Sequence, residues 1–491
     1  MAYEPLYTAE EMRAAEAAYP GPTLELMERA GKSVAGEILT RFPEARRVAV
    51  WCGTGANGGD GLVVAAELAR AGREPAVRLL GAEEKVVGDA AVMLERAQEV
   101  GVPFVEEHGS ADLAVDALFG TGFGGAPRPD AARAISELNA GGVPVVAVDL
   151  PSGVDASTGR VAGAAVEAAL TVTFHAAKVG HAIAPGRVHA GELVVADIGL
   201  AGIETRLRRA TSGILELVPR RTERENKYSA GSVLVVGGSR GLTGAPSLTS
   251  EAALRAGAGI VTACVPASLN LVFEQRLVEV MTRPCADEDG ALTPDAADEI
   301  LLAAERAGAV ALGPGLGRSD GTRALVGFLL DRLDKPVVLD ADGLWALAGH
   351  LDWVFSRDAP TVLTPHAGEL GRLLGRSSAW VSANRLDAVQ AGADDTGTVV
   401  LLKGIDTLVA GPGRSPVVVD LGNPGLATAG SGDVLTGVVG AFLAKGMDAS
   451  AAAAGAAAAC GVASGIAAER HGQAGMIARD VVESLSPALS R

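Results

Sequence analysis

The sequence predicts an α/β protein made of two doubly wound domains, an N-terminal Rossmann-like domain and a C-terminal one. Three observations support this. Short apolar runs such as Val143–Leu150 alternate with amphipathic stretches of helical length. Glycine-rich turns such as Gly53–Gly61 directly follow several of these runs. At 491 residues, the chain is too long for one ordinary hydrophobic core.

The composition is that of a soluble, globular protein, with 48% hydrophobic and 21% charged residues. The apolar runs are short and broken by Gly, Asp or Lys, so we expect no membrane-spanning segment and no membrane partner. Residues 1–5 do not resemble a signal peptide. The four cysteines are scattered without metal-ligand spacing, which favours a reducing compartment. We therefore expect a cytoplasmic protein.

The charge and aromatic content argue against nucleic acid as a partner. The formal net charge is −17, no polybasic patch is present, and aromatic residues make up only 3%. A small anionic ligand remains compatible with this charge, because a binding site relies on local dipoles and single lysines.

The elements of the first half alternate as a doubly wound domain requires. Thr8 and Glu11 form a capping-box pattern that begins a helix. A strand, a glycine-rich turn and a helix then follow one another, which places a phosphate or dinucleotide at the turn. In chain order we expect a helix over 8–39, strands over 47–52, 74–80, 111–119 and 143–150, and helices over 62–71, 85–100 and 128–140.

Polar residues fall at the carboxyl ends of successive predicted strands. Asn57, Asp116 and Ser152 supply hard oxygen donors, which suit a cation that prefers oxygen. Asp149 would then be a free carboxylate able to move a proton. The alternative is that these residues only cap strands and turns. His175 and Lys178 come on the next strand and turn, where each could contact a phosphate or lie on the solvated surface.

Three motifs of this half resemble the NAD(P)H-hydrate epimerase family. They are Gly53–Gly61, Asp116–Gly122 and Val148–Gly153, in the family's order over about 200 residues. The resemblance implies interconversion of the R and S epimers of hydrated NADH and NADPH. It implies potassium ligands at Asn57, Asp116 and Ser152, and a substrate-contacting, proton-moving role for Asp149. The implied substrate-binding residues are Ala56, Asn57, Gly58, Gly59 and Asp60, then Gly120, Thr121, Gly122, Phe123, Gly124, Gly125 and Ala126, and Asp149. Ala56 departs from the family, whose members often carry a second Asn there.

The character of the sequence changes after residue 199, where charged segments replace the alternation of strands and turns. These segments are Glu204–Arg209 and Pro219–Arg224. We place the domain boundary there, with domains over 1–214 and 215–491. The second domain begins with predicted strands over Ser232–Gly237 and Ile260–Val265.

The second domain is organised around Asn423–Asp433, a glycine-rich stretch that leads into a predicted helix. The free N–H groups at the start of that helix would bind an anion. Asp433 lies at the same point, where it could take a proton from a substrate hydroxyl or merely cap the helix. Polar residues also follow the preceding strands: Asp340, Asp342, His366, Glu369, Lys403 and Thr407. A lone His is usually structural, but the position of His366 after a strand and before Glu369 favours a functional role.

These features resemble the ribokinase-like superfamily and, more closely, the ADP-dependent NAD(P)H-hydrate dehydratases. The motifs are Asn423–Asp433, Thr364–Glu369 and Lys403–Thr407, and the match covers about residues 225–485. The resemblance implies adenine-nucleotide contacts at Lys403, Gly404, Ile405, Asp406, Thr407, Gly430, Ser431 and Gly432. It implies substrate contacts at Ala245, Gly317, His366 and Asp433, with Gly315 as the alternative to Gly317.

The implied chemistry begins with Asp433 acting as general base on the C6 hydroxyl of the hydrated nicotinamide ring. That hydroxyl attacks the terminal phosphoryl group of ADP, and N–H groups around Gly430–Gly432 stabilise the transferring charge. Elimination of phosphate then restores the reduced nicotinamide. Mg²⁺ is expected with ADP and would be reached by Asp340 and Asp342 through water, whereas K⁺ is expected in the epimerase domain.

Two other functions are compatible with parts of the sequence. One is a ribokinase-like small-molecule kinase with a nucleotide-binding N-terminal module, which would yield a stable phosphorylated product. The other is a regulatory binding module, in which Asp149→Asn would abolish ligand binding while affecting no turnover. The pairing with the three motifs of the first domain argues against the kinase, and the retained Asp149 and cation ligands argue against the binding module. We also expect the protein to assemble as a homo-oligomer.

Overall fold

The structure is a computed structural model that describes residues 1–220, 227 and 230–490. It divides into two compact units, residues 5–207 and residues 1–4 together with 208–491. The chain therefore passes from one unit to the other after Glu4 and again after Leu207. Most of the charged segment Pro219–Arg224 lies outside the described residues, and the functional boundary at 214/215 stays a prediction.

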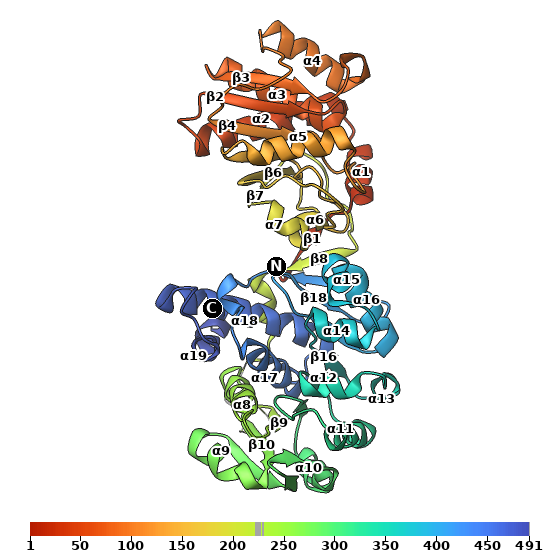
Figure 1. Cartoon of the computed structure of the whole chain (residues 1–491), viewed down its shortest axis with the longest axis vertical. Helices are drawn as coiled ribbons and strands as arrows, with labels where there is room; N and C mark the ends of the chain where they lie inside the picture. Colours follow the sequence, from red (N-terminus) through yellow and green to blue (C-terminus); the bar gives the residue numbers. More distant parts are fainter. Residues whose placement is uncertain (221–226, 228–229, 491) are drawn as a thin grey trace. The chain divides into compact units, whose positions relative to one another are not determined.

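The N-terminal unit contains a six-stranded parallel sheet in the order β3-β2-β4-β5-β6-β7 (Figure 1). The strands are β2 (Arg47–Cys52), β3 (Glu74–Leu79), β4 (Leu113–Ala117), β5 (Val145–Val148), β6 (Leu170–Phe174) and β7 (Glu192–Ala196). The chain leaves β2 toward β3 on one side and returns to β4 on the other. The loops that follow β2 and β4 therefore diverge, and a crevice forms between them at the carboxyl edge of the sheet.

Helices cover both faces of this sheet. On one face, α2 (Thr23–Arg41), α3 (Ala56–Arg70) and α4 (Asp89–Glu99) contribute buried side chains to one large apolar cluster. On the other face, α5 (Pro129–Ala140) packs Ile135 and Leu138 against the sheet in a separate cluster. The inner strands β2, β4, β5 and β6 are buried on both sides, which explains why they can be recognised as continuous apolar runs.

Two predicted helices differ from those observed. The single helix expected over 8–39 is two helices, α1 (Ala9–Ala17) and α2, because Pro20, Gly21 and Pro22 interrupt it. Thr8 caps α1 in the predicted capping box with Glu11. In addition, α3 begins at Ala56 rather than Leu62, so the glycine-rich stretch from Ala56 onward forms the first turns of the helix.

The C-terminal unit is built on an eleven-stranded sheet in the order β1-β8-β19-β18-β17-β16-β15-β14-β9-β10-β11. The strands are β1 (Tyr3–Leu6), β8 (Leu207–Ala210), β9 (Ser232–Val236), β10 (Ile260–Pro266), β11 (Met281–Cys285), β14 (Ala309–Leu312), β15 (Val337–Leu339), β16 (Thr361–Leu363), β17 (Val399–Leu402), β18 (Thr407–Ala410) and β19 (Val417–Val419). From β17 back to β11 the neighbours run parallel, while β18 is antiparallel to both β17 and β19. The predicted doubly wound α/β class is confirmed for this unit.

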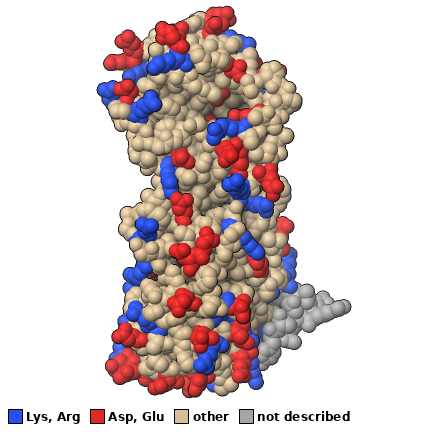
Figure 2. Space-filling view, turned by 90° about the vertical axis from the view of Figure 1, so that its right-hand side faces the viewer, with Lys and Arg blue, Asp and Glu red and all other residues tan. Residues whose placement is uncertain are grey.

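Four helices pack together on one side of the large sheet: α8 (Gly244–Arg255), α17 (Ser431–Ala444), α18 (Ala449–His471) and α19 (Ala478–Leu489) (Figure 1). By length and composition α18 could cross a membrane, but most of it is buried inside this unit. Its apolar character is therefore explained by contact with α17 and α19. On the face drawn in Figure 2, Lys and Arg side chains are interspersed with Asp and Glu.

Candidate active sites

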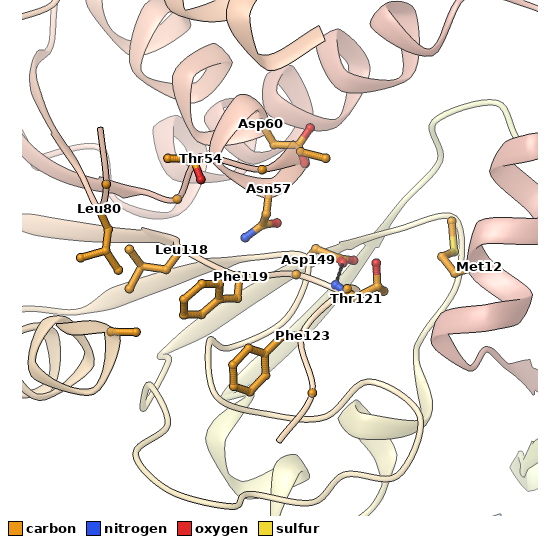
Figure 3. A pocket seen from close by; sticks show the side chains of 18 of the residues that line it. Met12, Thr54, Asn57, Asp60, Leu80, Leu118, Phe119, Thr121, Phe123 and Asp149 are labelled. Carbon is orange, nitrogen blue, oxygen red and sulfur yellow. Dashed lines mark hydrogen bonds between the residues drawn. The ribbon is translucent and has the colours of Figure 1, made fainter. Parts of the chain in front are cut away.

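A cavity of about 680 Å³ lies at the carboxyl edge of the six-stranded sheet, where the loops after β2 and β4 diverge (Figure 3). Its volume is typical of a small-molecule site. Most of the substrate-binding residues expected from the sequence line it, namely Ala56, Asn57, Asp60, Gly120, Thr121, Gly122, Phe123, Gly124, Ala126 and Asp149. The stacked rings of Phe119 and Phe123, 5.1 Å apart, form an aromatic wall.

Two expected substrate residues, Gly58 and Gly59, pack closely against neighbouring atoms. A Cβ added to Gly58 would lie 1.8 Å from the carbonyl oxygen of Gly53, so Gly58 is required for the close approach of α3 to the turn. A Cβ at Gly59 would lie 2.6 Å from the sulfur of Met27, which belongs to α2. Both glycines are buried and neither is among the residues that line the cavity. Gly125 is also absent from the lining residues.

Asp149 is a buried carboxylate, 6% exposed, at the end of β5. Its Oδ2 accepts a hydrogen bond of 3.1 Å from the Thr121 amide, and its Oδ1 accepts one of 3.0 Å from the Thr173 hydroxyl. Lys178 Nζ lies 2.7 Å from the same Oδ1. Burial alone would raise the pKa of Asp149, but the charge and hydrogen bond of Lys178 outweigh it and hold that pKa below its ordinary value.

Lys178 is not a solvated surface residue, because its side chain is only 1% exposed. Besides Asp149, its ammonium group donates to Thr173 Oγ1 at 2.8 Å and to the carbonyl of Phe174 at 2.9 Å. A phosphate contact is therefore not its role here. His175, the other residue considered for phosphate, lies outside the cavity lining and bonds through Nε2 to the hydroxyl of Tyr7.

Two further carboxyl groups line the cavity beside Asp149. Burial and the nearby charge of Asp149 raise the pKa of Asp60 well above its ordinary value. The same two causes raise the pKa of Glu16, which projects from α1. Sequence reasoning missed Glu16 and its helix neighbour Met12, because it searched strand ends and α1 precedes the first strand of this sheet.

The proposed potassium ligands Asp116 and Ser152 are directly bonded. The Ser152 hydroxyl donates to Asp116 Oδ1 at 2.6 Å and its amide donates to Oδ2 at 2.8 Å. Burial raises the pKa of Asp116 to about 6, and its recorded hydrogen-bond partners are all neutral. Asn57 does not bond to either residue, and its Nδ2 is buried without a partner. An oxygen-preferring cation fits this group, since it would compensate a buried carboxylate and engage hard oxygen donors.

In the C-terminal unit, the glycine-rich stretch Asn423–Asp433 ends in the first turn of α17, which begins at Ser431. Gly430 takes the N-cap position with φ +90°, and no side chain caps the helix. The first N–H groups of α17 therefore lack a side-chain acceptor, which makes the helix start suitable for an anion. Asp433 lies in the first turn without being the cap, so its alternative role as a helix cap is not realised.

Asp433 belongs to a compact cluster of charges with Asp340 and Lys403. Lys403 Nζ lies 2.8 Å from Asp340 Oδ1 and 3.9 Å from Glu369 Oε2. Burial first, and then the charge of Asp340, raise the pKa of Asp433 to about 7, while Lys403 acts in the opposite direction. A Cβ at Gly432 would lie 3.3 Å from Lys403 Nζ, so this glycine leaves the ammonium group accessible at the helix start.

His366 has a structural role that the sequence could not settle. It caps α14 (Ala367–Leu373), with Nδ1 accepting hydrogen bonds from the amides of Gly368 and Glu369 at 2.9 and 3.3 Å. Glu369 completes the capping box by accepting from the His366 amide at 2.8 Å. The ring remains 60% exposed, so a substrate contact through Nε2 stays a prediction.

The loop Lys403–Thr407 joins the antiparallel strands β17 and β18, and its side chains point to different surroundings. Ile405 is 52% exposed, whereas Asp406 is 1% exposed. Asp406 Oδ2 accepts a hydrogen bond of 2.9 Å from Nε of the buried Arg385. The side chain of Asp406 therefore holds the loop in place, and the nucleotide contacts expected of this loop stay a prediction for its other residues and its backbone.

The two candidate glycines near Ala245 are distinguished by their neighbours. A Cβ at Gly315 would lie 2.6 Å from the carbonyl of Leu242 and 3.4 Å from the Ala245 side chain. Gly317 instead donates its amide to Asp342 Oδ2 at 2.9 Å. Asp342 is thus engaged by Gly317 and by Arg318, and the choice of Gly317 as a substrate contact stays a prediction.

Comparison with known proteins identifies both halves. The family model described as NAD(P)H-hydrate dehydratase matches residues 233–487, and the model described as YjeF-related protein N-terminus matches residues 23–180. A solved ADP/ATP-dependent NAD(P)H-hydrate dehydratase from Bacillus subtilis, co-crystallised with ATP and Mg²⁺, is 27% identical, with a TM-score of 0.50 over 57% of this chain and 97% of its own. A ribokinase-like protein from Enterococcus faecalis, 22% identical, shares the fold with a TM-score of 0.50 over 59% of this chain and 98% of its own.

Relatives of similar length match almost the whole chain. The bifunctional NAD(P)H-hydrate repair enzyme Nnr of Moorella thermoacetica is 41% identical over 98% of this chain and 96% of its own length. The enzyme of the same name from Salinibacter ruber is 38% identical, covering 98% and 95%, and that from Escherichia coli is 36% identical, covering 94% and 88%. The chain therefore belongs to the family of bifunctional NAD(P)H-hydrate repair enzymes.

Proposed function

We propose that the protein repairs hydrated NADH and NADPH with two activities in one chain. The N-terminal domain interconverts the R and S epimers, and the C-terminal domain dehydrates the S form with ADP, yielding NAD(P)H, AMP and phosphate. The observation that carries this proposal is the presence of two carboxyl groups, Asp149 and Asp433, each at the carboxyl edge of its own sheet. Fusion is useful because a dehydratase alone would leave the R epimer unrepaired.

In the epimerase domain, Asp149 contacts the substrate and moves a proton at C6. Residues 56–60 and 120–126 bind the substrate, and the cavity lining supports this assignment for all of them except Gly58, Gly59 and Gly125. Potassium is proposed at Asn57, Asp116 and Ser152. The burial of the Asp116 carboxylate, which raises its pKa, and the oxygen atoms that all three side chains offer support a cation there.

In the dehydratase domain, Asp433 accepts the proton of the C6 hydroxyl as that oxygen attacks the terminal phosphoryl group of ADP. The amides at Gly430–Gly432 stabilise the charge on the transferring group, and Lys403–Thr407 hold the adenine nucleotide. Ala245, Gly317 and His366 face the hydrated nicotinamide nucleotide. When bound with the nucleotide, Mg²⁺ supplies positive charge to its phosphates, and Asp340 and Asp342 would hold it through water because their oxygens already accept protein hydrogen bonds.

Absorbance at 340 nm tests both activities, because only the repaired, reduced nicotinamide absorbs there. A mixture of the R and S epimers of hydrated NADH is incubated with the protein, Mg²⁺, K⁺ and ADP. We expect full recovery of absorbance with the wild type, partial recovery with Asp149→Asn and none with Asp433→Asn. A stable phosphorylated product without recovery of absorbance would favour a small-molecule kinase instead.

The compartment, partners and oligomeric state of the enzyme also form part of this proposal. We expect it to act in the cytoplasm on small molecules, without nucleic acid or membrane partners, and as an assembly of several copies. The four cysteines support a reducing compartment, since all are buried as free thiols. Sedimentation of the purified protein would measure the number of copies.

A further inference from the structure

We propose that Lys178 is a positioning residue for the epimerisation, which fixes Asp149, rather than Asp60 or Glu16, as the proton acceptor of the cavity. The inference rests on the proposed epimerase function and deepens it. It adds a residue outside the sequence motifs that identify the site, and the geometry of one buried ammonium group carries the argument.

The ammonium group of Lys178 has three N–H donors, and three acceptors surround it. They are Asp149 Oδ1 at 2.7 Å, Thr173 Oγ1 at 2.8 Å and the Phe174 carbonyl at 2.9 Å. The side chain is 1% exposed, so water does not compete for these donors. All three N–H donors of Lys178 are therefore engaged, and Asp149 is the carboxylate that it contacts directly.

This arrangement leaves one oxygen of Asp149 available to a substrate. Oδ1 accepts from both Lys178 and Thr173, whereas Oδ2 accepts only the amide of Thr121 among the described residues. Oδ2 also lies 3.1 Å from where a Cβ on the cavity-lining Gly120 would be, and Asn57 Oδ1 lies 2.8 Å from the same point. Because Gly120 has no side chain, the cavity stays open toward Oδ2.

The backbones of the two residues are tied together by His181. Its Nε2 lies 2.9 Å from the Asp149 carbonyl, and its Nδ1 accepts a hydrogen bond of 3.0 Å from the Lys178 amide. These contacts place the ring proton on Nε2. Asp149 has φ +65°, a conformation that costs a non-glycine residue free energy and persists only where neighbours impose it. His181 and Lys178 are two of those neighbours.

The remaining charged and titratable groups that face Lys178 are Asp60 of α3, Glu16 of α1 and His175 after β6. Lys178 acts on the two carboxyl groups through space only, which leaves their pKa values raised by burial and by Asp149. The three carboxyl groups of the cavity thus differ in acidity, because the pKa of Asp149 is lowered while those of Asp60 and Glu16 are raised. Environments that separate the pKa values of neighbouring acids are typical of acid–base sites.

An ionised Asp149 suits the chemistry of inversion at C6. The C6–O bond breaks as the hydroxyl takes up one solvent proton and leaves as water. A second water adds to the opposite face of the ring, forms the new C6–O bond and gives one proton to Asp149, which returns it to solvent. Atoms and charges balance, and a protonated Asp149 could not accept that proton.

The test compares Lys178→Met with Lys85→Met, which removes the same charge from an exposed position of the same unit. Conversion of the purified R epimer to the S epimer is followed by chromatography across pH. We expect Lys178→Met to lose roughly tenfold or more in kcat near neutral pH, with KM little changed, and to recover as the pH rises. The reason is that burial, no longer opposed by the ammonium group, would raise the pKa of Asp149. Lys85→Met should match the wild type.

A second variant keeps the proposal testable if Lys178→Met does not fold. Thr173→Val removes the hydroxyl that bridges Lys178 and Asp149 but keeps the shape of the side chain. It should shift the acidic limb of the pH–rate profile to higher pH, by less than Lys178→Met does. Dehydration of the S epimer by the same chain reports that the rest of the protein is intact. The role of Lys178 would be overturned if the acidic limb of the pH–rate profile were unchanged in both variants, or if kcat fell by the same factor at every pH. A wild type that fails to convert the R epimer would instead overturn the proposed epimerase function.

Discussion

The ammonium nitrogen of Lys403 lies 2.8 Å from Oδ1 of Asp340, and Oδ2 of the same carboxylate accepts a hydrogen bond of 2.7 Å from Thr436. Asp340 therefore connects the loop after β17 to α17, the helix that carries Asp433. Asp149 is bonded to a lysine of its own, whereas Asp433 lies near a lysine already bonded to Asp340. The two proposed bases consequently differ in acidity.

We predict that the two half-reactions respond differently to acid. The pKa of Asp433 is raised to about 7, so this base becomes protonated as the pH falls through that value. Dehydration of the purified S epimer should then fall by roughly tenfold per pH unit below that point. Epimerisation should persist at about pH 6, because the pKa of Asp149 lies below its ordinary value. Identical acidic limbs for the two rates would contradict the assignments.

We predict that potassium stabilises the N-terminal unit at alkaline but not at acidic pH. Burial raises the folded-state pKa of Asp116 from 3.8 to about 6, so its stability contribution is present below 3.8 and lost as the pH rises through 6. The loss is on the order of 3 kcal/mol, and a bound cation would offset part of it. Addition of K⁺ should therefore raise the melting temperature at pH 8 and leave it unchanged at about pH 4.

The control for ionic strength is choline chloride, which is too large for the site. The matched variant is Asp116→Asn, in which the effect of K⁺ on the melting temperature should vanish. An effect of K⁺ that is equal at both pH values, or that survives in Asp116→Asn, would count against this group as the cation site.

We predict that Gly58→Ala lowers the stability of the N-terminal unit, while Gly55→Ala in the same motif has only a small effect on it. The added Cβ would lie 1.8 Å from the Gly53 carbonyl oxygen, and the backbone would have to move. The expected cost is roughly 3 kcal/mol in the free energy of unfolding. At Gly55 no atom lies within 4 Å of the added Cβ, so we expect at most about 1 kcal/mol from the weaker helix cap. Urea unfolding followed by circular dichroism measures both, and equal losses would refute the packing role.

We predict that Asp406→Ala weakens the C-terminal unit even without nucleotide. The change would leave the guanidinium group of Arg385, 7% exposed, without its carboxylate, at a cost of about 3–5 kcal/mol. Ile405→Ala is the matched control in the same loop, because a half-exposed side chain contributes little to stability. Calorimetric unfolding in the absence of ADP measures the difference. If Asp406→Ala affected only the affinity for ADP, its side chain would belong to the nucleotide site.

The elements that the sequence predicted well are those whose local pattern determines them. The strand over 47–52 was predicted to the residue, because a strand buried on both faces is a continuous apolar run bounded by a charge and a glycine. The capping box at Thr8 depends on residues only three apart and was likewise confirmed. The convergence of Asn57, Gly120 and Asp149 on one cavity follows from the rule that ligands bind at the carboxyl edge of a parallel sheet.

What escaped prediction depends on partners distant in the sequence. Lys178 could not be distinguished from a surface lysine, because its acceptor Asp149 belongs to another strand. Asp406 lies within a motif that suggests nucleotide binding, yet its partner Arg385 lies on a helix before β17. Pro20, Gly21 and Pro22 are a signal that divides the first helix, but the helical spacing of apolar residues on either side favoured one continuous helix. Burial of a charge is decided by tertiary packing, which a local pattern does not contain.

The short strand at the start of the chain limits how the two activities can be separated. Met1–Glu4 packs with the unit formed by residues 208–491, where the Ala2 carbonyl accepts from the Thr211 amide and Glu4 pairs with Arg209 at 2.7 Å. A protease cut or gene split between Leu207 and Arg208 would leave this strand attached to the wrong fragment. The freed dehydratase would then expose the edge strand β8, which is a site for self-association. A single break at this point thus separates the C-terminal sheet from the edge strand that completes it.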